Sequence, residues 1–135
     1  MRALRPEDLP AATALLRAAG LPVEGVVPGP DFVAVFDDEG LVGLAGVERC
    51  AEAAWLLRSV VVAPRARGRG LGRALVADRI TWAEGRALWL LTTTAADWFE
   101  GLGFRRTARA EAPPQVRATD EFARLCPDSA VCMAL

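Results

Sequence analysis

The stretch from Arg67 to Arg73 combines glycines and arginines in a spacing suited to binding an anion. Glycines at positions 68, 70 and 72 let the backbone approach a phosphate closely, because they carry no Cβ. The arginine side chains add positive charge beside it. The candidate phosphate-binding residues are Arg67, Gly68, Arg69, Gly70, Leu71, Gly72 and Arg73.

The residues on either side of this stretch predict a strand before it and a helix after it. Val60, Val61 and Val62 form a β-branched run that ends shortly before Pro64. A helical pattern begins at about Gly70. A strand, a turn and a helix N-terminus in this order leave backbone N–H groups free to bind a phosphate.

Two better-known phosphate loops do not fit these residues. A P-loop requires a lysine, and the chain contains none. The dinucleotide fingerprint requires a third glycine three places after the second, where this chain has Arg73 or Leu75. The remaining pattern is Arg67-x-x-Gly70-x-Gly72, directly after a strand that ends in proline.

A second pattern downstream is Thr92-x-x-Ala95-x-x-Trp98-Phe99-x-x-x-Gly103-Phe104. Together the two patterns resemble those of the GNAT-type N-acetyltransferases. In that family Gln/Arg-x-x-Gly-x-Gly/Ala binds the pyrophosphate of acyl-CoA, and Asn-x-x-Ala-x-x-Phe-Tyr-x-x-x-Gly-Phe is the second motif. The resemblance covers the whole chain and is strongest over residues 55–104. It implies acetyl-CoA as cosubstrate and direct acetyl transfer to a primary amine in a ternary complex.

The resemblance also implies roles for residues around the coenzyme. The pantetheine arm would pair with the backbone of Val60–Val62, independently of their side chains. Thr92 stands in place of asparagine and would offer a hydroxyl, while Trp98 and Phe99 would line the coenzyme channel. Phe99 replaces the tyrosine that often protonates the leaving thiolate, and phenylalanine has no proton to give.

A carboxylate is the expected general base, because the attacking amine must be neutral and the chain has no histidine. Glu48 ends the strand beside the coenzyme strand, where the family often has a glutamate that acts through water. The alternative for Glu48 is a solvated strand end beside Arg49. Glu52 is expected to lie in the turn that follows.

Two arginines are candidates for binding the acceptor, namely Arg58 on the coenzyme strand and Arg117 in the C-terminal segment. Facing the pocket, either would bind a carboxylate or another oxyanion in a bidentate manner. The alternative for each is a surface salt bridge. Segment 117–133, with residues 57–59 and 90–94, resembles a subgroup of small acetyltransferases associated with arsenic resistance. That likeness implies an amino-acid-like acceptor such as a glutamate-like arsenical or a phosphinothricin-like compound.

Other functions stay open at the level of the sequence. The acceptor could be the N-terminus or a lysine of a protein. The chain could also be a non-catalytic acyl-CoA binder, because Phe99 replaces the tyrosine. A further class is an arsenite-binding protein with Cys50, Cys126 and Cys132 as three thiolates, although small buried hydrophobic residues are the ordinary alternative for cysteines.

The elements that must position these residues follow the order β-α-β-β-β-α-β-α-β-(α)-β. Strands are expected over residues 2–5, 31–36, 41–49, 54–62, 88–92, 104–109 and 129–134. Helices are expected over 6–19, 70–85, 95–102 and part of 113–125, and a loop over 21–30. This order is similar to the α/β mixed sheet of the GNAT acyl-CoA N-acyltransferase fold. That fold implies parallel fourth and fifth strands that splay apart to admit coenzyme A.

Composition limits size, partners and location. The 135 residues are enough for one N-acetyltransferase domain, residues 1–135, and 53% of them are hydrophobic. A net charge of −1 gives no general attraction to nucleic acid. No apolar run spans a bilayer and no signal pattern opens the chain, so we expect a cytoplasmic protein that binds no membrane.

Three cysteines and no histidine disfavour both a disulfide framework and a metal site. The expected partner is a small-molecule amine, and a homodimer is an open alternative to a monomer.

Overall fold

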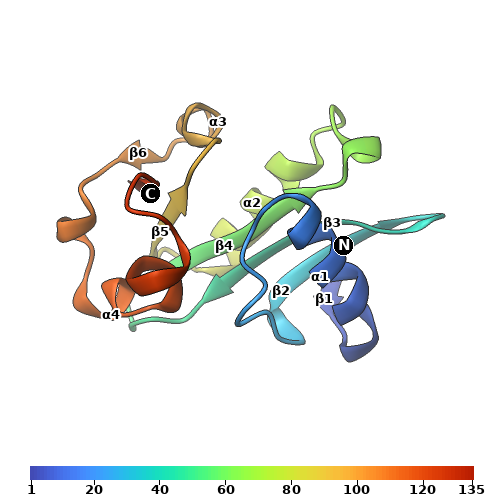
Figure 1. Cartoon of the computed structure of the whole chain (residues 1–135), viewed down its shortest axis with the longest axis horizontal. Helices are drawn as coiled ribbons and strands as arrows, with labels where there is room; N and C mark the ends of the chain where they lie inside the picture. Colours follow the sequence, from blue (N-terminus) through green and yellow to red (C-terminus); the bar gives the residue numbers. More distant parts are fainter. The chain divides into compact units, whose positions relative to one another are not determined.

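A computed structural model describes the whole chain, residues 1–135, as a mixed α/β fold (Figure 1). Its seven strands form one sheet in the order β1-β2-β3-β4-β5-β7-β6. The strands are β1 (Arg2–Leu4), β2 (Gly29–Asp37), β3 (Gly40–Glu48), β4 (Ala54–Val62), β5 (Ala87–Thr92), β6 (Arg105–Arg106) and β7 (Val131–Ala134). The α-helices are α1 (Leu9–Ala18), α2 (Leu71–Trp82), α3 (Ala96–Glu100) and α4 (Pro114–Arg117).

The chain divides into two compact units. The first comprises Met1–Val47 and Arg58–Trp82, and the second comprises Glu48–Leu57 and Ala83–Leu135. Strand β4 is shared, because its beginning belongs to the second unit and its end to the first.

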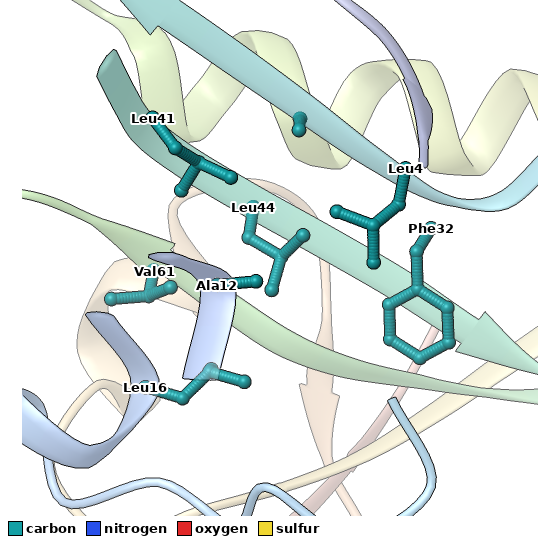
Figure 2. Packing of buried hydrophobic residues seen from close by; sticks show 8 residues of the cluster. Leu4, Ala12, Leu16, Phe32, Leu41, Leu44 and Val61 are labelled. Carbon is teal, nitrogen blue, oxygen red and sulfur yellow. The ribbon is translucent and has the colours of Figure 1, made fainter. Parts of the chain in front are cut away.

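One face of the strands in the first unit is covered by α1. Strands β1, β2 and β3 are antiparallel neighbours. The apolar cluster on this face consists of Leu4, Ala12, Leu16, Phe32, Ala34, Leu41, Leu44 and Val61, most of them labelled in Figure 2. Gly46 leaves room for the ring of Phe32, because a Cβ at that residue would lie 2.2 Å from the ring. The cluster holds α1 on the sheet by burial of apolar surface.

The other face of the first unit is covered by α2. Val33, Ala45 and Leu75 form its buried centre, and Val35, Val60 and Val62 pack at the edge of this cluster. Because successive residues of a strand point to opposite faces, adjacent residues such as Val33 and Ala34 in β2, or Val60 and Val61 in β4, serve different clusters. Strand β3 is accordingly buried from Leu41 to Val47, on both faces.

The second unit is built on β5. The beginning of β4 runs parallel to β5, with Ala54 opposite Ala87 and Leu56 opposite Trp89. From Trp89 to Thr92, β5 pairs antiparallel with β7. The apolar cluster of this unit consists of Ala54, Leu56, Ala112, Val116, Phe122 and Cys132. It joins the segment between β6 and β7 to the sheet.

The structure confirms the mixed α/β sheet and the parallel fourth and fifth strands, whereas several elements are shorter than expected. Helix α2 stops at Trp82 instead of residue 85, because Glu84 and Gly85 have left-handed φ angles of 50° and 83°. The strand expected over 104–109 is reduced to β6, whose partner β7 is itself only four residues long. Segment 113–125 forms α4 and then one π-helical turn, Glu121–Leu125. None of the helices has the length and apolar character that a membrane span requires.

Candidate functional site

The loop before α2, in the first unit, has a backbone suited to an anion. Gly68 and Gly70 have φ angles of 80° and 77°, in the left-handed region that glycine adopts without strain. The first hydrogen bond of α2 runs from Ala74 N to Gly70 O, at 3.0 Å. The N–H groups of residues 71–73 therefore precede the helical ladder and are available to a ligand.

Side-chain contacts fix this loop on the end of β4 and on the β2–β3 turn. Arg67 Nε donates to the carbonyl oxygen of Val62 at 3.0 Å. Arg65 forms ion pairs with Asp37 at 3.2 Å and Glu39 at 3.1 Å. The hydrogen bond from Arg65 holds the pKa of Asp37 below its ordinary value. The charge of Arg65 is thus largely balanced within the protein.

Arg69 and Arg73 provide the positive charge that stays available around the loop. Both side chains are exposed, and the structure shows no carboxylate beside either of them. The space into which a Cβ at Gly68 or Gly70 would point is open, with no heavy atom within 4 Å. The loop therefore offers N–H donors, cationic side chains and room for a bulky anion such as a pyrophosphate.

The strand before the loop uses its side chains for the core. Val61 packs in the α1 cluster, and Val60 and Val62 pack in the α2 cluster. Just before them, Ser59 has a φ of 58°, a left-handed conformation that interrupts the regular strand. Any ligand that met Val60–Val62 would meet backbone rather than side chain, as a paired pantetheine arm would.

Arg58 lies immediately before this irregular residue and is buried. Its Nε donates to Ser59 Oγ at 3.1 Å, and its Nη2 donates to the carbonyl oxygen of Glu24. The guanidinium also lies over the ring of Phe32, with Cζ 5.9 Å from the ring centre. The structure thus places Arg58 in contact with the loop that precedes β2.

In the second unit, two carboxylates lie near one thiol. Glu48 is half-buried at the end of β3, and its carbonyl oxygen accepts a hydrogen bond from Cys50 Sγ at 3.3 Å. Burial, together with the negative charges of Glu48 and Glu121, raises the pKa of Cys50 to about 11. Cys50 also packs against the cluster that contains Phe122. The structure therefore brings the end of β3 and the segment after α4 together.

Glu121 is a buried carboxylate that the sequence analysis did not single out. Its side chain is 8% exposed and lies on the π-helical turn Glu121–Leu125. Such turns are rare and have no sequence signature comparable to a helix cap, although they are frequent at functional sites. A buried acidic residue beside Cys50 was therefore not predictable from its neighbours in the chain.

The other predicted residues of the second unit, Arg117 and Thr92, make hydrogen bonds within their own segments. Arg117 is exposed at the end of α4, and its Nε donates to the carbonyl oxygen of Ala112 at 3.0 Å. The hydroxyl of Thr92 accepts a hydrogen bond from Ala95 N at 3.0 Å and so stabilises the turn before α3. That bond occupies the Thr92 oxygen as an acceptor and leaves its proton available.

The two aromatic residues of the second motif differ in exposure. Trp98 is 42% exposed, whereas Phe99 is 6% exposed. Phe99 packs edge to face with Trp98 at 4.9 Å and with Phe104 at 5.5 Å between ring centres. Phe99 is therefore a packing residue, while Trp98 presents aromatic surface to solvent.

The three cysteines do not form a trithiolate group. All are free thiols, Cys132 is buried, and no three His, Cys, Asp or Glu side chains of the chain lie together as metal ligands would. Arsenite binding by three thiolates therefore has no geometric support.

A comparison with family models and solved structures places this arrangement among known proteins. Residues 28–106, more than half of the chain, match the model of the acetyltransferase (GNAT) domain. An N-acetylglutamate synthase from Neisseria gonorrhoeae, complexed with coenzyme A and N-acetyl-glutamate, has 24% identity and a TM-score of 0.79 over 98% of this chain. Its complex with coenzyme A and L-arginine has 22% identity and a TM-score of 0.75, also over 98% of this chain.

This chain spans about a third of the length of those synthases, 34% and 32% in the two structures. Rv2747 from Mycobacterium tuberculosis, solved with coenzyme A, is similar over nearly its whole length. It has 18% identity and a TM-score of 0.78, covering 99% of this chain and 96% of Rv2747. These likenesses show a shared fold.

Proposed function

The chain belongs to the GNAT acetyltransferase family. We propose that it is an acetyl-CoA-dependent acetyltransferase and that its acceptor is the primary amine of a small amino-acid-like molecule. The observation that carries the proposal is the loop before α2. Its three free N–H groups, its two left-handed glycines and the exposed Arg69 and Arg73 suit the pyrophosphate of the coenzyme.

The coenzyme would lie along the first unit. In the proposal, residues 67–73 bind the pyrophosphate and the backbone of Val60–Val62 pairs with the pantetheine arm. The packing of the three valine side chains supports this, because Val61 is buried and Val60 and Val62 are half-buried, so a ligand beside the strand would meet mainly its backbone. In the second unit, the Thr92 hydroxyl and the exposed Trp98 are proposed to contact the coenzyme, while Phe99 supports Trp98 from the core.

The chemical step needs a neutral amine and a leaving thiolate. The thioester supplies an electrophilic carbonyl carbon. We assign Glu48 as the general base, which takes a proton from the acceptor ammonium through a water molecule. The amine nitrogen then forms the C–N bond while the C–S bond breaks, and the second nitrogen proton passes to solvent or to the departing thiolate. A thiolate with a pKa of about 8.5 can leave as the anion or take a proton from solvent, so no enzyme acid is required.

An amino-acid-like acceptor would need a cationic partner for its carboxylate. Arg117 suits this role, because only its Nε is hydrogen-bonded, to the carbonyl oxygen of Ala112, and its two Nη groups remain as donors. A synthase with the same fold, complexed with N-acetyl-glutamate, is consistent with an acceptor of this class. The finer proposal, a glutamate-like arsenical or phosphinothricin-like acceptor, rests on the sequence likeness of segment 117–133.

An acceptor panel tests the proposal directly. Acetyl-CoA is mixed with glutamate, methionine, phosphinothricin, arsinothricin and simple alkylamines, and the release of free thiol is followed. Amino acids should be acetylated faster than alkylamines of the same size. Equal rates for alkylamines would contradict the acceptor class, and binding of acetyl-CoA without thiol release from any amine would favour a non-catalytic acyl-CoA binder.

Replacement of Arg117 tests the carboxylate contact. Arg117→Ala should raise the acceptor KM by roughly ten- to a hundredfold, since a charge-assisted contact contributes about 1.5–3 kcal/mol, and should leave the acetyl-CoA KM unchanged. Arg124→Ala is the matched control, because Arg124 lies in the same segment and its ion pair with Asp120 is exposed. An unchanged acceptor KM in Arg117→Ala would exclude this residue as the carboxylate partner.

A further inference from the structure

Arg58 is a charged side chain that is only 4% exposed, at a place where β4 is irregular. Its guanidinium is oriented by Ser59 Oγ on one side and by the Phe32 ring on another. Its Nη2 reaches out of the sheet to the carbonyl oxygen of Glu24. A buried guanidinium held this firmly can fix the backbone to which it is bonded.

The loop that Arg58 contacts has few backbone hydrogen bonds of its own. Leu21 N donates to the carbonyl oxygen of Leu16 at 3.0 Å, but residues 22–28 form no backbone–backbone hydrogen bond. Leu21, Val23 and Val26 anchor it by packing against the α1 cluster. Apolar contacts are not directional, so they bind the loop to the core without setting the orientation of its peptide groups. The bond from Arg58 to the Glu24 carbonyl supplies that orientation.

Gly25 shows how closely the loop fits the guanidinium. Its φ is 81°, and a Cβ at this residue would lie 2.7 Å from Arg58 Nη1. No larger residue fits here unless the arginine moves. The outer side of the loop is open, with Val27 53% exposed. The loop therefore presents a surface to solvent whose position depends on Arg58.

We propose that Arg58 is a positioning residue that holds the 21–28 loop beside the coenzyme strand and thereby sets affinity for the acceptor. The inference rests on the proposed function, in which the pantetheine arm runs along β4 from Val62 towards Arg58. Four strand residues span about 13 Å, so Arg58 lies well along the strand from the pyrophosphate loop, towards the thioester end. A loop fixed at this level would border the acceptor amine.

Two variants test the contact from its two sides. Arg58→Met keeps an unbranched apolar stem and removes the donors. Gly25→Ala leaves Arg58 in place but puts a methyl group against its Nη1. Gly20→Ala is the matched control, because Gly20 has a similar φ of 71° and no heavy atom within 4 Å of its Cβ position. Backbone ¹⁵N order parameters of residues 23–27 report the order of the loop directly, and KM values for acceptor and acetyl-CoA report its role.

Both variants should lower the order parameters of the loop amides from about 0.85 to about 0.6 and raise the acceptor KM by roughly three- to tenfold, with the acetyl-CoA KM unchanged and Gly20→Ala like wild type. The rise should be equal for the best amino-acid acceptor of the panel and for its α-amide. A rise confined to the free carboxylate, with unchanged order parameters, would show instead that Arg58 binds the acceptor itself. Lower order parameters with an unchanged acceptor KM would also overturn the proposal. If wild type acetylates no amine, the proposed function and the acceptor role both fail, while the order parameters still decide whether Arg58 holds the loop.

Discussion

Glu48 is the last residue of β3 and Cys50 lies two residues after it, yet one carries a charged group and the other a protonated one. The Glu48 carboxylate is half-buried and carries negative charge next to the thiol. The Cys50 thiol is held in its protonated form by burial and by the nearby carboxylates. A protonated thiol is a weak nucleophile and a poor metal ligand. At this site the carboxylate is therefore the residue suited to proton transfer.

We predict that Cys50 reacts slowly with iodoacetamide in the folded protein. With a pKa of about 11, its thiolate fraction at pH 8 is roughly a hundredfold lower than that of an ordinary cysteine. Alkylation at Cys50, followed by mass spectrometry across pH, should reach half its maximal rate near pH 11. Glu48→Gln should shift this midpoint downward, because one negative charge is removed, but not to the ordinary value, because burial remains. A midpoint near pH 8.5 in the wild type would contradict the described environment.

Glu48→Gln is also the direct test of the general base. The amide cannot accept the proton, so kcat should fall by about a hundredfold or more, while acetyl-CoA binding stays unchanged. Glu52→Gln is the control, because Glu52 is an exposed carboxylate in the following turn. Full activity of Glu48→Gln would show that another group is the general base, and Glu121 would be tested next.

At the scale of elements, the strand, loop and helix around residue 70 together form the proposed pyrophosphate site. The strand uses its side chains to hold the site on the core, and the helix supplies its free N–H groups. The glycines make the turn possible, since Gly68 and Gly70 are left-handed.

Gly70→Val should abolish coenzyme binding by placing a branched side chain in the open space of the loop. The substitution also strains the backbone, because φ is 77° at this residue. Gly20→Val carries the same strain at a φ of 71°, also with no heavy atom within 4 Å, and lies outside the loop. Thermal shift with acetyl-CoA should be lost in the first variant and retained in the second, with circular dichroism as the check on folding. Equal thermal shifts with acetyl-CoA in both variants would show that the loop does not bind the coenzyme.

At the scale of the whole molecule, the absence of tyrosine and histidine limits acid catalysis. Phe99 occupies the tyrosine position of the second motif and is buried between two aromatic rings. We therefore predict that kcat/KM rises towards alkaline pH as the amine loses its proton and then levels off. No falling limb from an enzyme acid should follow before the protein unfolds. Phe99→Tyr should change the rate little, and a bell-shaped profile centred near neutral pH would require another acid.

Local patterns in the sequence were sufficient to predict the glycine-rich turn between β4 and α2, the main strands and the fold class. Glycine spacing and β-branched runs act through the conformation of a few neighbouring residues, so they can be interpreted without the rest of the chain. The same reasoning failed at residues 104–109, because the length of β6 depends on β7, which lies far along the chain. The end of α2 was also predicted too far along the chain, since no pattern marked the left-handed Glu84.

The roles of individual polar side chains required the tertiary structure. From sequence, Arg58 was a candidate pocket residue with a surface salt bridge as the ordinary alternative. Its burial against Phe32 and its bond to a carbonyl 34 residues away in the chain come from packing. Glu121 lies near Cys50 only because the turn after α4 folds onto the segment that follows β3. Backbone preferences are set by near neighbours, whereas the environment of a charge is set by residues that only folding brings together.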